Sequence, residues 1–282
     1  MSYIIEYLKV IFLGIVEGIT EWLPISSTGH MLLVDEIFTL DQTDAFKEFF
    51  FVAIQLGAIA AVVVIFWNKM WPFQLKNKEE KFVKTDTIIT WLKVAVACIP
   101  SVIVGLFLDD IIEEIFYTPF WIAIMLIVYG LAFILVENWN KKRTPKISEF
   151  ESIDFKTAFL IGIFQALAVM PGTSRSGATI IGALIIGISR TAAAEFTFFL
   201  ATPTMIGATG LKFVKYILDG NSFDINQILI LTVGMIIAFI VSMLCIRWLM
   251  SFIRKHDFKP FGWYRIALGA VVLILLALGI FA

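Results

Sequence analysis

Two long apolar regions of this chain are each interrupted near the middle by Pro, Gly, Ser, Thr and charged residues. The first region spans residues 4–37 and the second spans residues 156–188. A continuous lipid-facing helix would not carry such a break, because non-helical backbone survives at membrane depth only where protein or a water-filled cavity satisfies its hydrogen bonds. We therefore interpret both regions as re-entrant helix–turn–helix segments.

The composition is typical of a membrane protein. Hydrophobic residues make up 60% of the 282 residues and charged residues only 16%, against about a quarter in soluble domains. Six further stretches are long enough to cross a bilayer core, which takes about 20 helical residues. They lie near 48–67, 87–107, 118–137, 191–211, 226–247 and 262–281. The predicted fold is an all-α integral membrane protein with six transmembrane helices and two re-entrant segments. It forms a single membrane domain over 1–282, and nothing indicates a nucleic-acid partner.

Lys and Arg concentrate in three loops, and such loops usually face the cytoplasm. These residues are Lys69, Lys76, Lys78, Lys81 and Lys84 after the first span, Lys141, Lys142, Arg143, Lys146 and Lys156 between the halves, and Arg254, Lys255 and Lys259 before the last span. The loops at 35–48 and 108–117 are mainly acidic and are expected on the outer side. This assignment places the C-terminus outside.

The chain also contains a weak internal repeat. Each half has one broken region followed by three spans, with the first repeat at about 1–140 and the second at about 150–282. Because three is odd, the two halves would cross the membrane in opposite senses. The spacing from Gly14 to Gly29 equals that from Gly162 to Gly177. Inverted repeats whose broken helices meet near the midplane form buried polar sites, so we predict such a site here.

Glu17 and Glu21 are four residues apart in the first broken region and share one face of a helix. An ionisable side chain within the membrane is by default a functional-site hypothesis. Two like charges at this spacing require a cation, a shared proton or a nearby arginine. Mg²⁺ is a suitable partner if the substrate is a phosphate, since it binds one or two carboxylates together with phosphate oxygens. The alternative is that Glu21 merely reaches the membrane interface.

The second broken region has the residues of an anion site. After Pro171, the chain has Gly172, Ser174, Arg175, Ser176 and Thr179 at the expected start of a half-helix. Helix N-termini present free N–H groups that favour phosphate, and the planar guanidinium group of arginine grips two phosphate oxygens. The alternative is a structural break that contains a salt-bridged arginine.

The matching break in the first region contains Ser26, Ser27, Thr28 and His30. Ser26 is expected to cap the second half-helix, and we place Ser26 and Thr28 among the substrate-binding residues. Ser27 is a nucleophile candidate if a base lies within reach. His30 follows one helical turn later on the same face, as a general base, a general acid or a nucleophile itself. The sequence leaves the attacking group open among Ser27, His30 and water.

Taken together, these motifs resemble the undecaprenyl-diphosphatase family. Its Glu/Gln-x-x-x-Glu motif matches Glu17 to Glu21, its Pro-Gly-x-Ser-Arg-Ser-x-x-Thr motif matches Pro171 to Thr179, and its histidine matches His30. The resemblance covers essentially the whole chain. It implies that the active-site residues are Glu17, Glu21, Ser27, His30, Ser174, Arg175 and Thr179, with Glu17 and Glu21 as metal ligands.

The resemblance also implies an activity and a location. It implies hydrolysis of undecaprenyl diphosphate to the monophosphate and inorganic phosphate, dependence on Mg²⁺ or Ca²⁺, and bacitracin tolerance. The expected location is the bacterial plasma membrane, with membrane lipids around the spans and the active site open to the outer face. A homodimer is left open. The rival hypothesis is a transporter or flippase of an anionic polyprenyl phosphate lipid, because inverted repeats with broken helices are primarily a transporter device.

Overall fold

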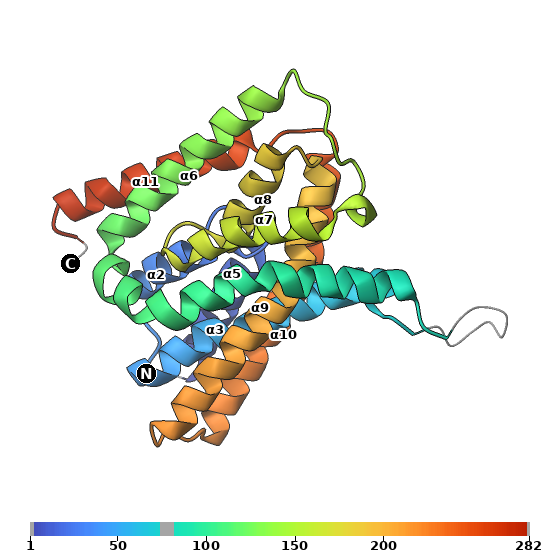
Figure 1. Ribbon diagram of the computed structural model, residues 1–282. Helices are drawn as coiled ribbons and strands as arrows, with labels where there is room; N and C mark the ends of the chain where they lie inside the picture. Colours follow the sequence, from blue (N-terminus) through green and yellow to red (C-terminus); the bar gives the residue numbers. More distant parts are fainter. Residues whose placement is uncertain (1–2, 74–81, 281–282) are drawn as a thin grey trace.

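The chain forms a bundle of helices of unequal length (Figure 1). The computed structural model describes residues 3–73 and 82–280. The α-helices are α1 (Tyr3–Thr20), α2 (Ser27–Ile37), α3 (Asp44–Ile65), α4 (Trp67–Met70), α5 (Thr85–Phe116), α6 (Pro119–Asn140), α7 (Phe155–Ala166), α8 (Arg175–Ile186), α9 (Arg190–Leu218), α10 (Ile225–Ile253) and α11 (Lys259–Ala277). Two short 3₁₀ helices, η1 (Phe150–Ser152) and η2 (Leu167–Val169), flank α7.

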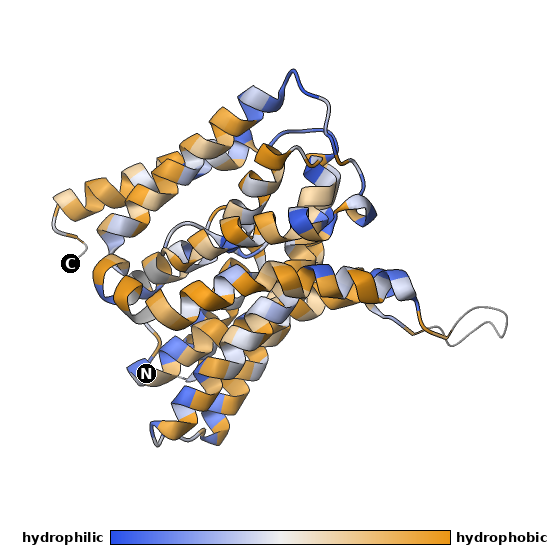
Figure 2. Cartoon of the chain, viewed as in Figure 1, coloured by the Kyte–Doolittle hydropathy of each residue, from blue (hydrophilic) through white to orange (hydrophobic). Residues whose placement is uncertain are grey.

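Among the described residues, five helices are long and apolar enough to cross a membrane. They are α3, residues 85–108 of α5, α6, α10 and α11. Hydrophobic residues predominate along these helices (Figure 2), and many of their large apolar side chains are exposed. The sixth expected span, 191–211, falls within α9, whose 29 residues include several threonines, Pro203 and Glu195 and are less apolar. The predicted loop at 108–117 is largely helical, since α5 continues to Phe116.

Both predicted breaks are present, and they have the same local structure. α1 ends at Thr20 and α2 begins at Ser27, while the α7–η2 segment ends at Val169 and α8 begins at Arg175. The residue before each second helix is a serine with positive φ, 76° at Ser26 and 70° at Ser174. Each serine hydroxyl accepts a hydrogen bond from the backbone N–H three residues on, at Gly29 and Gly177. The side-chain cap therefore satisfies a donor that the helix start would leave free.

The two broken segments pack on the long helices of opposite halves. α1 lies against α10, and α7 lies against α5. Close approach is possible because Gly14 and Gly162 have no side chain at these crossings. A Cβ atom on Gly14 would lie 3.0 Å from the Gly234 carbonyl oxygen, and one on Gly162 would overlap the Ala97 carbonyl. α6 and α11 form a separate pair at one side of the bundle (Figure 1). This arrangement brings both breaks to the middle of the molecule.

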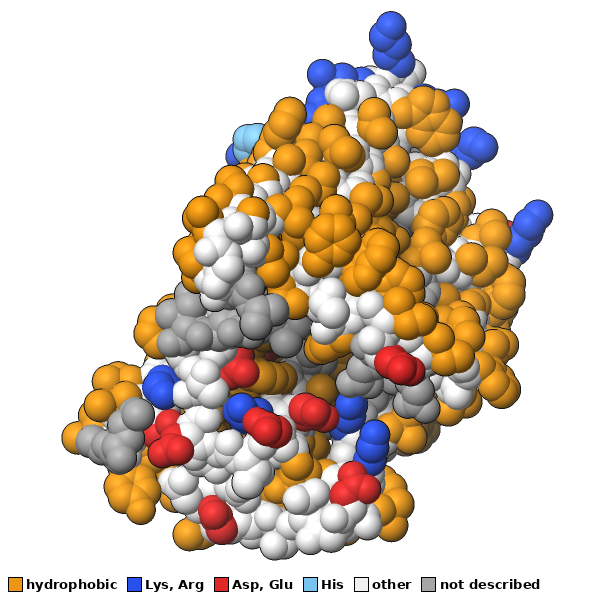
Figure 3. Space-filling model, turned by 90° about the vertical axis from the view of Figure 1, so that its left-hand side faces the viewer, with side chains coloured by type: hydrophobic (Ala, Val, Ile, Leu, Met, Phe, Trp, Pro, Cys, Tyr) orange, Lys and Arg blue, Asp and Glu red, His pale blue; other side chains and the backbone are white. Residues whose placement is uncertain are grey.

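Charged side chains are unevenly distributed over the surface. In Figure 3, Lys and Arg gather at the upper end, and most of the visible Asp and Glu lie in the lower half. Two long helices end at predicted cytoplasmic residues, α6 at Lys141 and α10 at Arg254. Lys76, Lys78 and Lys81 of the first predicted basic loop lie outside the described residues. The described part of the chain therefore has one predominantly basic end.

Candidate active site

The two breaks enclose a pocket of about 200 Å³ in the middle of the molecule. Seven of the predicted site residues line it: Glu21, Ser26, Ser27, Thr28, Gly172, Ser174 and Arg175. α3 and α9 complete the wall with Gln55 and Thr204. The predicted residues Glu17, His30, Ser176 and Thr179 lie around this pocket without lining it. The sequence motifs therefore converge from separate halves of the chain into one polar space.

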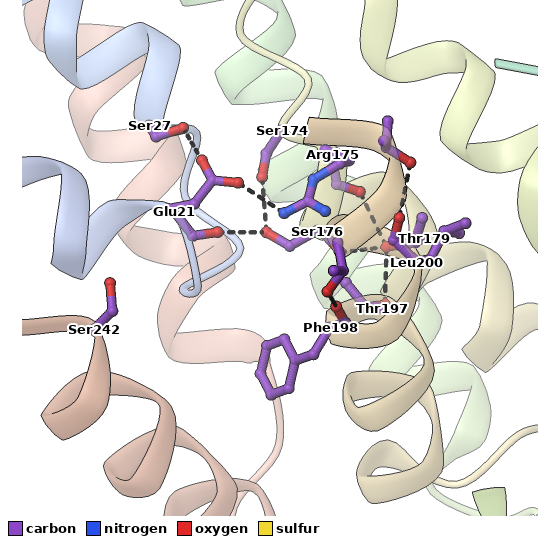
Figure 4. Close-up of polar contacts among 12 residues, drawn as sticks. Glu21, Ser27, Ser174, Arg175, Ser176, Thr179, Thr197, Phe198, Leu200 and Ser242 are labelled. Carbon is purple, nitrogen blue, oxygen red and sulfur yellow. Dashed lines mark hydrogen bonds and ion pairs between the residues drawn. The ribbon is translucent and has the colours of Figure 1, made fainter. Parts of the chain in front are cut away.

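Glu21 joins the two breaks (Figure 4). Its Oε1 accepts a hydrogen bond from Nη2 of Arg175 at 2.7 Å, and its Oε2 accepts one from the Ser27 hydroxyl at 2.5 Å. The hydroxyl of Ser176 donates to the backbone carbonyl of Glu21 at 3.3 Å. Glu21 and Arg175 are both largely buried, with side chains 8% and 13% exposed. A buried carboxylate is thus held by a cation on one side and points at a serine hydroxyl on the other.

Arg175 keeps unused hydrogen-bonding capacity. Its Nη2 is paired with Glu21, but its buried Nη1 has no acceptor among the described residues. Buried donors without partners are rare, and each one requires an explanation such as an absent ligand. Arg175 is also the first residue of α8, where a helix N-terminus favours an anion. The pocket therefore offers a guanidinium N–H and a helix N-terminus to a ligand with phosphate oxygens.

Glu17 lies one helical turn before Glu21, fully buried behind it. Neither oxygen of its carboxyl group has a donor partner among the described residues, and its charged neighbours are Glu21 and Arg175. No group of three or more His, Cys, Asp and Glu side chains in the described chain is placed to hold a metal. Two adjacent carboxyl groups nevertheless fit Mg²⁺, which commonly takes one or two protein carboxylates and completes its shell with phosphate oxygens and water.

His30 has a different environment from the one that its spacing suggested. Its Nδ1 lies 2.7 Å from the Ser26 carbonyl oxygen, and its Nε2 lies 2.7 Å from the hydroxyl of Tyr264 on α11. The two rings stack with centroids 5.6 Å apart. The hydrogen-bond partner of the Ser27 hydroxyl is consequently Glu21, not His30. α2 presents Ser27 to the pocket and His30 to α11, which sequence spacing alone did not distinguish.

Thr179 and Ser176 hold α8 in place beside the pocket. The Thr179 hydroxyl lies 2.9 Å from that of Thr197 on α9, and it also reaches the carbonyl oxygens of Arg175 and Ser176 (Figure 4). Both side chains are buried. Their contacts fix the first turn of α8, which carries Arg175, against α9 and the α1–α2 connection.

Sequence reasoning missed Arg265, which is fully buried in α11. Its guanidinium group donates to the carbonyl oxygen of Pro24 at 3.1 Å in the first break. In the second break, it donates to those of Gly172 at 2.7 Å and Thr173 at 2.9 Å. One side chain therefore holds the two turns together. The only signal in the sequence was an arginine inside an expected span, at residues 262–281.

Known proteins match this chain over nearly its whole length. The family model "Bacitracin resistance protein BacA" matches residues 10–271. A protein of Enterococcus faecalis named undecaprenyl-diphosphatase is 63% identical over 97% of this chain and 98% of its own length. Proteins of the same name from Desulfitobacterium hafniense and Streptococcus thermophilus are 53% and 55% identical, each over 96% of this chain and over 96% and 94% of their own lengths. The chain belongs to the bacitracin resistance protein BacA family.

Proposed function

We propose that this chain is an acid anhydride hydrolase that converts undecaprenyl diphosphate to undecaprenyl phosphate and inorganic phosphate. The observation that carries the proposal is the buried pocket in which Arg175, with one N–H group unpaired, faces the Ser27–Glu21 hydrogen bond. The names of the full-length relatives support the choice of substrate. Release of the monophosphate would renew the lipid carrier that bacitracin sequesters, which accounts for tolerance to that antibiotic.

In this mechanism, the protein binds the terminal phosphate and presents a nucleophile. Arg175 and the N-terminus of α8 bind the phosphate oxygens and stabilise the charge that is spread over them during transfer, where most of the rate enhancement in phosphoryl transfer arises. The Ser27 oxygen attacks the terminal phosphorus, and Glu21 accepts its proton. The anhydride P–O bond breaks, and undecaprenyl phosphate leaves. Water then hydrolyses the phosphoserine to inorganic phosphate and restores the serine.

The carboxyl groups of Glu17 and Glu21 are the proposed ligands of a divalent cation. Mg²⁺ or Ca²⁺ bound there would neutralise charge on the diphosphate. Apart from the adjacent carboxyl group of Glu21, the two oxygens of Glu17 have no hydrogen-bond partner among the described residues, which supports this role. When phosphate binds Arg175, the hydrogen bond between Arg175 and Glu21 would weaken, and Glu21 would be free to bind the cation.

His30 is the proposed positioning residue of the first break. Both ring nitrogens are engaged, one with the carbonyl oxygen of Ser26 and one with the Tyr264 hydroxyl. These contacts fix the residue before Ser27 and hence the direction of the serine hydroxyl. Attack by His30 itself, or by water that it activates, would require the reacting ring nitrogen to leave its present partner, whereas Ser27 already lines the pocket, so the geometry favours Ser27.

We further propose a membrane arrangement with six spans and two re-entrant segments. The repeats at about 1–140 and 150–282 would then run in opposite senses, with α9 as the sixth span. The serine caps at Ser26 and Ser174 support the repeat, since they occupy equivalent positions in it. The basic end would face the cytoplasm of a bacterium. The pocket would open to the outer face of the plasma membrane.

Phosphate release from undecaprenyl diphosphate by the purified protein in detergent tests this function against lipid transport. Hydrolysis needs no membrane-separated compartments, whereas transport does. We expect release by the wild type and none by Ser27→Ala, with a covalent phosphate on Ser27 trapped in acid-quenched reactions. Phosphate found on His30 would overturn the serine mechanism. A folded wild type that releases no phosphate but moves the lipid between leaflets would support the transporter.

A further inference from the structure

A second, larger cavity of about 650 Å³ lies at the basic end of the molecule. It is open to solvent on one side and is bounded by the ends of α6, α8, α9 and α10 and by the connection at 143–147. α8 links it to the catalytic pocket, since Arg175 begins this helix and Gly187 follows its last residue. Twelve helical residues separate the two ends by about 18 Å. We call this space the basic cavity, and the mechanism above makes no use of it.

Cations dominate the lining of the basic cavity. It contains Lys141, Arg143, Lys146, Arg190, Arg254, Lys255 and His256 against Glu137 and Asp257. Both acids already have partners. Glu137, fully buried, accepts two hydrogen bonds from Arg190, at 2.8 and 2.5 Å, and one from the backbone N–H of Phe258. Asp257 pairs with Lys259 at 3.4 Å. Within the described chain, the other five Lys and Arg side chains of the lining pair with no carboxylate.

Hydrogen bonds and one cation–ring contact hold part of this lining in place. The backbone N–H of Lys146 donates to the Gly187 carbonyl oxygen at 2.7 Å, and the Asn140 side chain donates to that of Leu184 at 3.1 Å. The guanidinium group of Arg143 lies 3.6 Å from the centre of the Trp139 ring. The five unpaired cations are exposed, and four helix ends bring them around one open cavity without a carboxylate partner among the described residues, which indicates an anionic occupant.

We propose that the basic cavity binds the phosphate group of an anionic ligand. A phosphate carries up to two negative charges and three strong acceptor oxygens, which match several converging cations better than a single carboxylate does. Arg and Lys together provide the charge-assisted hydrogen bonds that phosphate takes. The volume lies within the range of small-ligand sites. A lipid phosphate headgroup and free inorganic phosphate share this chemistry, and the proposal does not depend on the activity of the catalytic pocket.

The test compares two pairs of substitutions that remove equal charge from the same end of the molecule. Lys141→Gln with Lys146→Gln removes two cavity cations, whereas Lys142→Gln with Lys156→Gln removes two cations that do not line the cavity. Arg254→Gln with Lys255→Gln removes two cavity cations on another element, so that misfolding of the first pair does not decide the result. All variants carry Arg175→Ala, which removes the guanidinium from the catalytic pocket.

Two ligands are offered to each full-length variant in detergent. The first arm measures radiolabelled inorganic phosphate bound in equilibrium dialysis. The second measures retention of dioleoyl phosphatidic acid over phosphatidylcholine by native mass spectrometry. We expect both cavity pairs to weaken binding by about tenfold or more while the control pair changes little. Loss confined to the first arm identifies free phosphate, and loss in the second identifies a lipid headgroup. If the cavity and control pairs bind alike in both arms, the proposal is wrong.

Discussion

The two breaks have the same backbone and opposite chemistry. Ser26 and Ser174 both have positive φ and cap the helix that follows. The next residue is Ser27 in the first break and Arg175 in the second, and the buried position before each turn is Glu17 in the first and Gln165 in the second. The capping serines, which both breaks share, fix where the second helices start. The residues that differ give the first break its carboxylates and the second its cation, so that opposite charges attract where the breaks meet.

The shared strain also indicates where function lies. A non-glycine residue held at positive φ costs of order 1–3 kcal/mol and persists only when its surroundings demand it. In the described chain, Ser26 and Ser174 are the non-glycine residues with positive φ, and both line the pocket between the breaks. The two breaks are therefore equivalent in structure and unequal in chemistry.

The largest expected effect follows from removing the cation of the second break. Arg175→Ala should lower phosphate release by about 10³-fold, because it deletes the group that stabilises charge on the transferring phosphoryl. Arg175→Lys should recover only part of the rate, since an ammonium group lacks the planar fork. The measurement is kcat on undecaprenyl diphosphate in detergent. Near-normal turnover in the alanine variant, with an unchanged unfolding midpoint, would remove the phosphate-clamp role.

A second prediction makes the first break more like the second. Glu17→Gln puts the counterpart of Gln165 in the proposed metal site, so the Mg²⁺ concentration for half-maximal activity should rise by about tenfold or more. Excess chelator should abolish wild-type activity, and added Mg²⁺ should restore it. The reverse change, Gln165→Glu, is the matched control and should leave the Mg²⁺ dependence unaltered, because Gln165 does not itself line the pocket and donates to Ser101 on α5 and, at 3.4 Å, to Thr204 on α9. Equal effects of both changes would contradict the assignment.

A third prediction separates the two breaks physically. Arg265→Gln leaves the carbonyl oxygens of Pro24, Gly172 and Thr173 without their charged donor. Each buried carbonyl that loses its partner costs about 1–3 kcal/mol, so we expect a lower unfolding midpoint and a fall in kcat of about tenfold. Arg247→Gln, at an exposed position of α10, is the control and should change neither value. Loss of stability with kcat unchanged would make Arg265 structural only.

The sequence was most informative where polar residues interrupt an apolar run. Glu21 and Arg175 were found in this way, because a charge within a membrane segment requires a partner. Arg265 was missed because it sits near the start of an expected span, where a basic residue looks interfacial. The direction of His30 depends on how α2 is rotated against α11, which helical spacing does not fix. The basic cavity was equally inaccessible, since it combines residues from connections that are distant in sequence.

The smallest predicted effect tests the structural equivalence itself. Ser26→Ala and Ser174→Ala each delete a side-chain cap while keeping the strained backbone, and each should lower the free energy of unfolding by about 1 kcal/mol. Ser26→Gly and Ser174→Gly lose the same hydrogen bond, but glycine adopts positive φ without strain, so both should be nearly neutral. Reversible unfolding in mixed micelles measures all four. If the alanine and glycine variants had the same stability at one break and different stabilities at the other, the two turns would not be structurally equivalent. The repeat would then include the surrounding helices but not the turns.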